Sequence, residues 1–162
     1  MNWKRFYHGA RLYLIPSGVG RTRYVKKKCL FGGVGEHVML QPRKLPLYSE
    51  LIFIGNNVRI ASGVNFITHD VLHNVLNHLP EEMRGETVFR EKKGKIVIGD
   101  NVFIGANSLI MYNVTIGSNV VIGAGSVVTK DLPDNSVCAG VPCRKIGSFE
   151  ALVEKRRLES SR

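Results

Sequence analysis

A six-residue spacing of aliphatic side chains between residues 98 and 132 is the feature that most restricts how this chain can fold. The aliphatic positions are Ile98, Ile104, Ile110, Ile116, Ile122 and Val128. Neither the helical period of about 3.6 residues nor the strand period of 2 fits this pattern as well. A short, fixed period indicates a solenoid, and a period of six indicates a β-helix.

The remaining positions of each hexapeptide support the same interpretation. The residue after the aliphatic one is glycine in four of the six units, and the fifth position is small or apolar in all of them. These fifth positions are Val102, Ser108, Val114, Val120, Ser126 and Leu132. We expect each hexapeptide to form one side of a triangular coil, with the aliphatic and fifth residues pointing inward. The Gly, Asn or Asp after the aliphatic residue is expected at the bend, because these residues tolerate unusual backbone angles. One coil cannot satisfy its own backbone, so coils must stack as parallel strands.

The motifs that end the repeat carry a resemblance to a known family. Residues 99–147 contain GAGSVVTKDLP and AGVPCRKIG. They resemble the C-terminal half of the hexapeptide-repeat acetyltransferases, in the branch that contains galactoside, maltose and xenobiotic acetyltransferases. The strong resemblance covers residues 52–147. It implies an all-β fold, a left-handed parallel β-helix of hexapeptide repeats, together with a homotrimer and acetyl transfer from acetyl-CoA.

Length and composition limit the remaining possibilities. A chain of 162 residues has room for one domain. It has no apolar run long enough to predict a membrane span, and its charged N-terminus is a poor signal peptide. The three cysteines, Cys29, Cys138 and Cys143, lack the spacing of a metal site. A small, odd number of cysteines is typical of a reducing compartment, so we expect a cytoplasmic protein.

The net charge of +10 needs a separate explanation. Basic residues gather at residues 21–28, 91–95 and 155–157. No aromatic platform, recognition helix or zinc motif accompanies them, so nucleic acid is not the expected partner. Anionic ligands, such as the phosphates of coenzyme A or an anionic or nucleotide-linked sugar, are one explanation. A solvated basic surface is the alternative for any single run.

The two ends of the chain are predicted to be helical. Residues 1–24 form an N-terminal cap segment, in which Trp3, Phe6, Tyr7, Ala10 and Leu14 have helical spacing. Their apolar face is expected to cover the open end of the prism, and residues 16–20 are expected to form a loop. The β-helix is assigned to residues 25–147. Residues 148–162 are expected to form a C-terminal helix that covers the other end.

The repeat is interrupted twice inside the β-helix. Residues 41–46 break the period, which is expected to resume at Tyr48. No hexapeptide fits residues 68–95, which are polar and contain His69, His73 and His78. A long excursion from a regular repeat is usually functional. The resemblance implies that this loop projects from the prism and helps to build the active site of a neighbouring subunit.

Acetyl transfer from a thioester to a hydroxyl needs a base, an oxyanion donor and a site that holds the coenzyme. His69 is the candidate base, because histidine accepts a proton near physiological pH and the segment IASGVNFITHD resembles the family's catalytic segment. Asp70 is a candidate to orient the imidazole or contact the acceptor. His73 and His78 are expected to face water. The spacing of His69 and His73 could suggest a metal, but no acidic or cysteine ligands accompany it, so no metal is expected.

The resemblance supplies the positions for the coenzyme. It implies the backbone N–H of Ala106 as the oxyanion donor. Phe103 stands where the branch usually has tryptophan, so it offers an apolar wall without the indole N–H. The further positions matched for coenzyme A are Ala124, Thr129, Lys130 and Arg144. The two basic side chains suit phosphates.

The sequence therefore predicts an acetyl-CoA-dependent O-acetyltransferase, trimeric, with active sites between subunits and direct transfer without an acyl-enzyme. The expected acceptor is a hydroxyl of a sugar, a glycoside or a surface-polysaccharide precursor. A xenobiotic O-acetyltransferase, an amino-sugar N-acetyltransferase and a non-catalytic β-helix scaffold are the alternatives. The acceptor is not named by the sequence, because residues 68–95 and the N-terminal coils match nothing closely.

Overall fold

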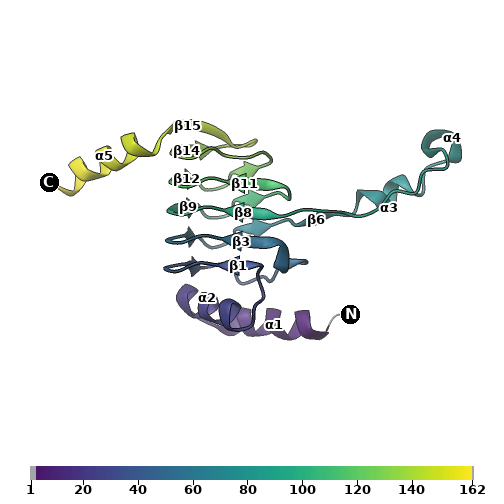
Figure 1. Ribbon diagram of the computed structural model, residues 1–162, viewed down its shortest axis with the longest axis horizontal. Coiled ribbons are helices and arrows are strands. Elements are labelled where there is room, and N and C mark those ends of the chain that lie inside the picture. Colours follow the sequence, from purple (N-terminus) through teal and green to yellow (C-terminus); the bar gives the residue numbers. More distant parts are fainter. Residues whose placement is uncertain (1–2, 162) are drawn as a thin grey trace.

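The computed structural model describes residues 3–161 and is a stack of short coils with a helix pair at one end (Figure 1). Three parallel sheets form the sides of the stack, and the chain visits them in turn. The first side consists of β1 (Gly33–Val34), β3 (Ile52–Ile54), β8 (Ile96–Ile98) and β11 (Val114–Ile116). The second side consists of β2 (Met39–Leu40), β4 (Arg59–Ile60), β9 (Val102–Ile104), β12 (Val120–Ile122) and β14 (Ser136–Ala139), with β15 (Arg144–Ser148) antiparallel at its edge. The third side consists of β5 (Asn65–Phe66), β10 (Leu109–Ile110) and β13 (Val127–Val128).

The core of the stack is the column predicted by the repeat. All six aliphatic positions and all six fifth positions between residues 98 and 132 are buried. Ile98, Ile116 and Ile54 stack within the first side through the register of β3, β8 and β11. Burial of these side chains supplies the main driving force for stacking the coils.

The bends are made by different residues from those the repeat predicted. The left-handed conformation falls on Asn101, Asn107, Asn113 and Asn119, three positions after each aliphatic residue, with φ between 56° and 58°. Asparagine tolerates this conformation better than most residues. The glycines that directly follow the aliphatic residues have another purpose. A Cβ on Gly99 would lie 2.8 Å from the carbonyl carbon of Gly117 in the next coil, so these glycines allow adjacent coils to approach closely.

The asparagines of one corner form a ladder along the stack. The side-chain amide of Asn57 donates to Asn101 at 2.9 Å, Asn101 donates to Asn119 at 2.9 Å, and Asn119 donates to Asn135 at 2.8 Å. Each asparagine therefore both forms the bend and connects one coil to the next.

Two helices occupy the start of the described chain, α1 (Trp3–Leu14) and α2 (Gly18–Lys27). The loop expected at residues 16–20 is wrong, because Ser17 caps α2 and accepts a hydrogen bond from the backbone N–H of Gly20 at 3.0 Å. The start of the β-helix at residue 25 is also too early, since α2 continues to Lys27 and the first strand begins at Gly33.

The helix that covers the end of the prism is α2 and not α1. Val25 is buried, Arg21 Nε donates to the carbonyl oxygen of Leu40 at 2.9 Å, and the Thr22 hydroxyl accepts from the N–H of Leu40 at 3.1 Å. In α1 only Leu12 is buried. The aromatic side chains expected to cover the prism are exposed, because the apolar face of α1 points the other way.

The first interruption also differs from the expected register. Tyr48 has φ of 51° and precedes a short 3-10 helix, η1 (Ser49–Leu51). The coil resumes at Ile52 and not at Tyr48. A left-handed residue cannot continue a strand, so the Tyr48 side chain is directed away from the interior column and lies half-buried.

Residues 68–95 form a long arm that projects from the stack, as Figure 1 shows. Its stem is an antiparallel pair, β6 (His69–Asp70) with β7 (Lys92–Lys93). Two short helices follow along it, α3 (Leu72–Leu76) and α4 (Glu81–Arg84). The side chain of Asn77 ties the two halves of the arm together by accepting from the N–H of Phe89 and donating to its carbonyl oxygen, each at 2.8 Å.

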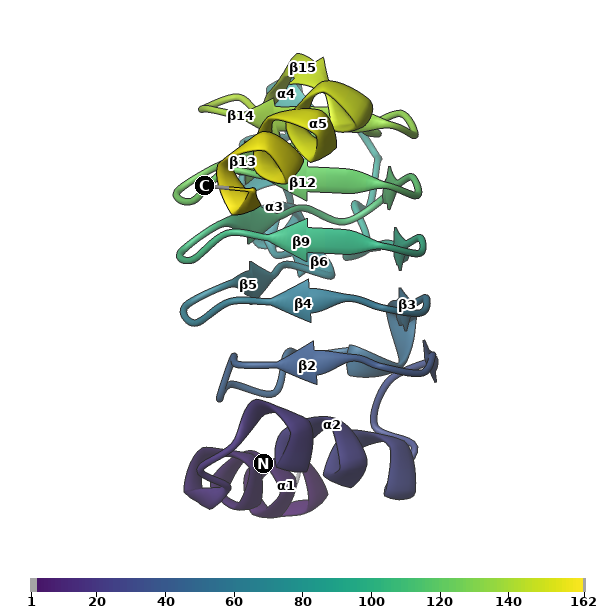
Figure 2. The same ribbon diagram turned by 90° about the vertical axis from the view of Figure 1, so that its left-hand side faces the viewer.

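The last helix, α5 (Phe149–Ser160), does not cover the far end of the prism. It has no buried residues and extends sideways from the stack, as Figures 1 and 2 show. The antiparallel pairing of β15 with β14 redirects the chain before α5 begins. Ser148 then caps α5 by accepting from the N–H of Ala151 at 3.2 Å. Among the described helices, none is long and apolar enough to cross a membrane.

Candidate active site

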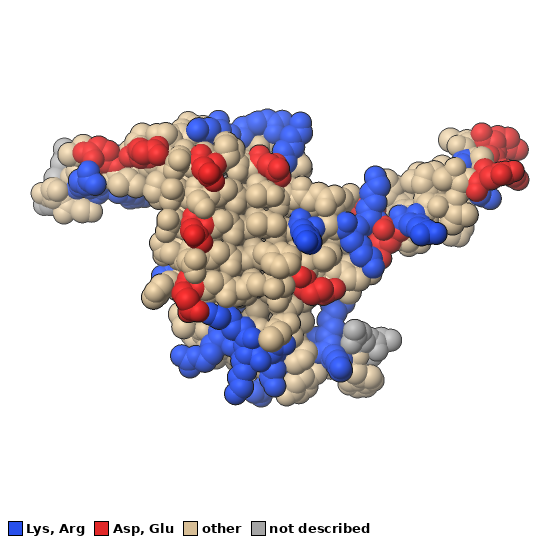
Figure 3. All heavy atoms as spheres, viewed as in Figure 1, with Lys and Arg blue, Asp and Glu red and all other residues tan. Residues whose placement is uncertain are grey.

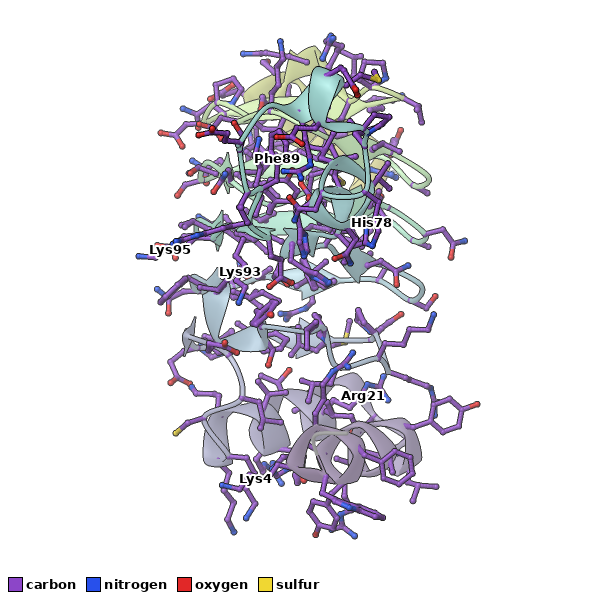
Figure 4. The ribbon with its side chains drawn as sticks, turned by 90° about the vertical axis from the view of Figure 1, so that its right-hand side faces the viewer. Lys4, Arg21, His78, Phe89, Lys93 and Lys95 are labelled. Atoms are coloured by element: carbon purple, nitrogen blue, oxygen red, sulfur yellow. The ribbon has the colours of Figure 1, made fainter. Side chains whose placement is uncertain are left out.

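His69 lies where the arm leaves the stack. β5 ends at Phe66, three residues before the stem begins at His69, and His69 is paired in register with Lys93 across the stem. The Thr68 hydroxyl donates to the carbonyl oxygen of Leu47, which fixes the chain directly before His69. Figure 4 looks along the arm and labels Lys93 of the stem together with Lys95, His78 and Phe89.

An aromatic and charged cluster surrounds the imidazole. The ring of Tyr48 meets the ring of His69 edge to face, with 5.4 Å between the ring centres. The Tyr48 hydroxyl donates to Glu91 Oε2 at 2.8 Å, and Lys93 Nζ lies 3.8 Å from the centre of the Tyr48 ring. Lys93 Nζ also lies 3.1 Å from Glu91 Oε2. These contacts hold Tyr48 in one orientation against His69.

The electrostatics of this cluster centre on Glu91. The hydrogen bond from Tyr48 lowers the pKa of the Glu91 carboxyl, and Lys93 and His69 lower it further. Glu91 therefore stays ionised at neutral pH. A fixed negative charge therefore lies close to the imidazole of His69.

One nitrogen of His69 is buried without a partner. Nδ1 of His69 is enclosed by the protein and finds no hydrogen-bond partner in the described part of the chain. Buried polar atoms of this kind are rare. Because Nδ1 is enclosed, any group from outside the chain would have to meet the other ring nitrogen, Nε2.

Asp70 is held by two contacts within the chain. The Tyr112 hydroxyl donates to Asp70 Oδ2 at 2.5 Å, and the N–H of Leu72 donates to Oδ1 at 3.1 Å. The hydrogen bond from Tyr112 lowers the pKa of the Asp70 carboxyl and raises that of the Tyr112 hydroxyl. Because Tyr112 belongs to the next coil, this pair fastens the stem to the stack.

The other two arm histidines differ from each other. His78 is exposed, and its Nδ1 lies 2.6 Å from the carbonyl oxygen of Asn74. His73 is only half-exposed, and its Nδ1 is buried without a partner among the described residues. The expectation that His73 faces water is therefore wrong for that nitrogen. No group of three His, Cys, Asp or Glu side chains able to hold a metal occurs in residues 3–161.

The small residues matched to the coenzyme lie at another corner. Ala106 and Ala124 stack where the second side meets the third, with the N–H of Gly125 donating to the carbonyl oxygen of Ala106 at 2.8 Å. Ala124 is exposed and Ala106 is half-exposed. Phe103 stands on the outer face of the second side, between Arg59 and Val121 in the register, and is 45% exposed.

The polar positions lie toward the far end of the stack. Thr129 and Lys130 follow β13, at the corner where the third side meets the first, and both are exposed. This is the corner that carries the arm, although β10 separates β13 from β5 within the sheet. Arg144 begins β15, is exposed, and donates from its guanidinium to the carbonyl oxygen of Cys143 at 3.2 Å.

One chain therefore does not bring all the predicted positions together. His69 and Lys130 share one corner, whereas Ala106 and Ala124 occupy a second corner and Phe103 lies on the adjoining face. The sequence prediction also missed Tyr48, Glu91, Lys93 and Tyr112. The only signals were the basic run at residues 91–95 and the break before Tyr48, and neither indicates a contact with His69.

Comparison with known proteins decides the family. The family model described as "Bacterial transferase hexapeptide (six repeats)" matches residues 95–130. The galactoside O-acetyltransferase of Escherichia coli strain K12 is 39% identical over 143 residues, which cover 81% of this chain and 70% of that protein. The chain belongs to the hexapeptide-repeat acetyltransferases. This membership confirms the resemblance, and the fold of the family is the left-handed β-helix.

Two further proteins are similar to this chain. Protein CapG of Staphylococcus aureus is 50% identical over 111 residues, which cover 65% of this chain. The chain spans 57% of the length of CapG. The solved structure of a galactoside acetyltransferase in complex with coenzyme A has a TM-score of 0.62 and 30% identity, and covers 91% of this chain and 80% of that one.

Proposed function

We propose that this chain is an acetyl-CoA-dependent O-acetyltransferase that acts on a hydroxyl of a sugar, a glycoside or a surface-polysaccharide precursor. Its similarity to galactoside O-acetyltransferase over most of both chains supports a sugar acceptor. The neighbour solved with coenzyme A supports the donor. Free thiols at Cys29, Cys138 and Cys143 suit a reducing cytoplasm, which is the compartment we propose.

The observation that carries the proposal is the setting of His69. It stands at the base of the arm, against Tyr48 and close to the ionised Glu91, with a buried nitrogen that has no partner in the described chain. An imidazole fixed at the base of the arm beside an ionised carboxylate suits a general base, and since Nδ1 is enclosed, Nε2 is the nitrogen that would meet the acceptor.

The proposed reaction is a direct transfer. His69 accepts the proton of the acceptor hydroxyl while the hydroxyl oxygen attacks the thioester carbonyl carbon of acetyl-CoA. The tetrahedral intermediate then collapses, the carbon–sulfur bond breaks, and the coenzyme A thiolate takes the proton back from the imidazolium. The products are the acetyl ester and free coenzyme A, and no acyl-enzyme forms.

The donor side of this site is proposed to come from a second copy of the chain. The corner with Ala106 and Ala124 has small side chains, which allow an extended pantetheine arm to lie close to the backbone. The N–H of Ala106 would stabilise the oxyanion, and Phe103 would form an apolar wall. Thr129, Lys130 and Arg144 would meet the polar end of the coenzyme, with the two cations on its phosphates. Because Ala106, Ala124 and Phe103 do not lie at the corner of His69, a homotrimer with shared sites is the assembly we propose.

Asp70 is better suited to positioning than to direct contact with the acceptor. Both of its oxygens already accept hydrogen bonds within the chain, from Tyr112 and from the backbone of Leu72. We propose that this pair sets the position of His69 relative to the stack. The acceptor would then lie between the arm and the neighbouring subunit.

The test is release of coenzyme A thiol in the presence of galactosides, maltose and amino sugars. We expect hydroxyl acceptors to be used, and His69→Ala to reduce kcat/KM by about 10²- to 10⁴-fold, the usual contribution of a general base. His78→Ala is the matched control, because His78 is exposed on the same arm, and it should retain wild-type activity. Equal activity of the two variants would contradict the role of His69. Exclusive use of amino sugars would indicate N-acetylation.

A further inference from the structure

The positive charge of this chain is concentrated at one end. Of its 23 lysines and arginines, ten lie in residues 1–47, where Glu36 is the sole acidic residue. The other 115 residues contain 13 basic and 12 acidic residues and are almost neutral. Figure 3 shows the resulting gathering of basic side chains around α1 and α2. Residues 1–47 therefore account for nine of the ten net positive charges, and the part of the chain that holds the candidate active site accounts for one.

The apolar face of α1 at this end points outward. Successive residues of a helix are about 100° apart, which places six side chains in one stripe: Trp3, Phe6, Tyr7, Ala10, Tyr13 and Leu14. All six are exposed, with exposed fractions from 56% for Tyr7 to 74% for Leu14 among the large ones. Leu12, on the opposite face, is the one buried residue that α1 contributes. An apolar stripe of this length normally faces a core, so its exposure requires a partner.

Basic side chains border the stripe on both sides. Lys4 and Arg11 follow Tyr7 around the helix on one margin, as the 100° spacing requires. On the other margin, Arg43 donates to the carbonyl oxygen of Tyr13 at 2.6 Å, and its guanidinium lies 5.5 Å from the centre of the Tyr13 ring. Lys44 lies next to it, along a groove of about 510 Å³ between α1 and residues 43–45. The surface is thus an apolar stripe within a basic frame.

We propose that the outward face of α1 and its basic margins bind the surface of an anionic lipid bilayer. An amphipathic helix with aromatic and leucine side chains on one face lies in the plane of the interface, with those side chains among the acyl chains. The flanking lysines and arginines then meet anionic headgroups. The coils and the arm would remain in water. This inference does not depend on the proposed enzymatic function.

The composition of the surface favours a membrane over other partners. A second copy of the chain that met this face with its own would bring two basic ends together, which like-charge repulsion opposes. A nucleic acid would use the cations, but it offers nothing to a continuous stripe of apolar side chains. An anionic bilayer matches both the charge and the apolar stripe.

Trp3 provides a direct test, because it lies in the stripe and is the single tryptophan of the chain. The full 162-residue chain is mixed with vesicles of equal parts phosphatidylglycerol and phosphatidylcholine, and with vesicles of phosphatidylcholine alone. On the anionic vesicles we expect the protein to sediment with the lipid, its fluorescence to shift to shorter wavelength, and lipids brominated in their acyl chains to quench it. On phosphatidylcholine alone, binding should be weaker by about tenfold or more.

Two pairs of variants separate the apolar and the charged contributions. Phe6→Ser/Leu14→Ser should weaken binding by about tenfold or more, whereas Leu158→Ser, an exposed residue of α5, should not change it. Lys4→Gln/Arg11→Gln should weaken binding severalfold, and Lys155→Gln/Arg156→Gln, on α5, should not. Circular dichroism and light scattering confirm that each variant is folded and keeps its oligomeric state.

Three results would overturn the proposal. The first is no sedimentation and no fluorescence shift with anionic vesicles. The second is binding that salt abolishes, without a Trp3 shift and without any effect of Phe6→Ser/Leu14→Ser, which would indicate a general polyanion surface. The third is a Trp3 fluorescence spectrum that is already shifted to shorter wavelength without lipid, together with a change of oligomeric state in Phe6→Ser/Leu14→Ser. That result would indicate a contact between copies of the chain.

Discussion

The regular coils and the arm differ in how many of their side chains are buried and in what holds them in place. In the coils between residues 98 and 132, every interior position is buried and every bend is supported by the coil above or below. In the arm, α3 and α4 include no buried residue, and the arm is held by the β6–β7 pair and by side-chain links such as Asn77 with Phe89 and Asp70 with Tyr112. The repeat therefore makes the coils rigid, whereas the arm that interrupts it has no core to fill and can expose polar and titratable side chains.

The largest effect on stability is expected inside the coils. Ile116 is fully buried on β11, and Thr115 beside it points outward. Ile116→Ala should lower the free energy of unfolding by about 2–5 kcal/mol, because it leaves a cavity in a close-packed column. Thr115→Ala should change it by less than about 0.5 kcal/mol. Urea unfolding followed by circular dichroism measures both, and a similar loss for the two variants would contradict the inward column.

A smaller effect is expected at the corner ladder. Asn119 has φ of 57° and hydrogen bonds to Asn101 and Asn135. Asn119→Ala removes those bonds and puts a less tolerant residue in the left-handed region, so a loss of about 1–3 kcal/mol is expected. Asn119→Gly keeps the backbone angle and should lose less. If the alanine and glycine variants unfold at the same denaturant concentration, the conformational part of this explanation is wrong.

The smallest effect on stability is expected at the base of the arm. Tyr112→Phe removes the hydrogen bond that lowers the pKa of Asp70, so this pKa should rise toward its ordinary value. In the wild type, the stabilisation is complete above the ordinary pKa of aspartate, about 4, and is lost as pH falls through the lowered value. The variant should therefore be less stable than the wild type at neutral pH, and the difference should disappear in acid.

Thermal unfolding at neutral and acidic pH, with an NMR titration of the Asp70 carboxyl, tests this prediction. Tyr7→Phe is a matched control, because Tyr7 is exposed on α1. If the difference in stability between Tyr112→Phe and the wild type grew toward low pH, the predicted direction of the pH dependence would be wrong.

The coils could be predicted from the sequence because their interior is periodic. The spacing of Ile98, Ile104 and Ile110 identifies the buried column without knowledge of any distant contact. The same reasoning assigned the bend to the glycine position, although Asn101 and its equivalents make it. The sequence does show asparagine at the position that bends. Only the structure separates the two roles, because it shows that Gly99 allows the next coil to approach closely while Asn101 makes the bend.

The surroundings of His69 could not be predicted, because they depend on contacts between distant parts of the chain. Tyr48 and Glu91 are 43 residues apart and meet through one hydrogen bond. Asp70 and Tyr112 are 42 residues apart. The direction of α1 was also beyond the sequence, since helical spacing identifies an apolar face but not which side of the helix meets the prism.

The central proposal is that the arm of one chain delivers its base to a coenzyme site on the coils of another. The most direct measurement is activity after two inactive variants are unfolded or dissociated together and reassembled. His69→Ala removes the base, and Ala124→Tyr fills the exposed small position proposed for the pantetheine arm. Each variant alone should be inactive, and the mixed assembly should regain thiol release, because some sites combine His69 of one chain with Ala124 of another. A mixture that stays inactive, although both variants are folded and co-assemble, would contradict the shared site.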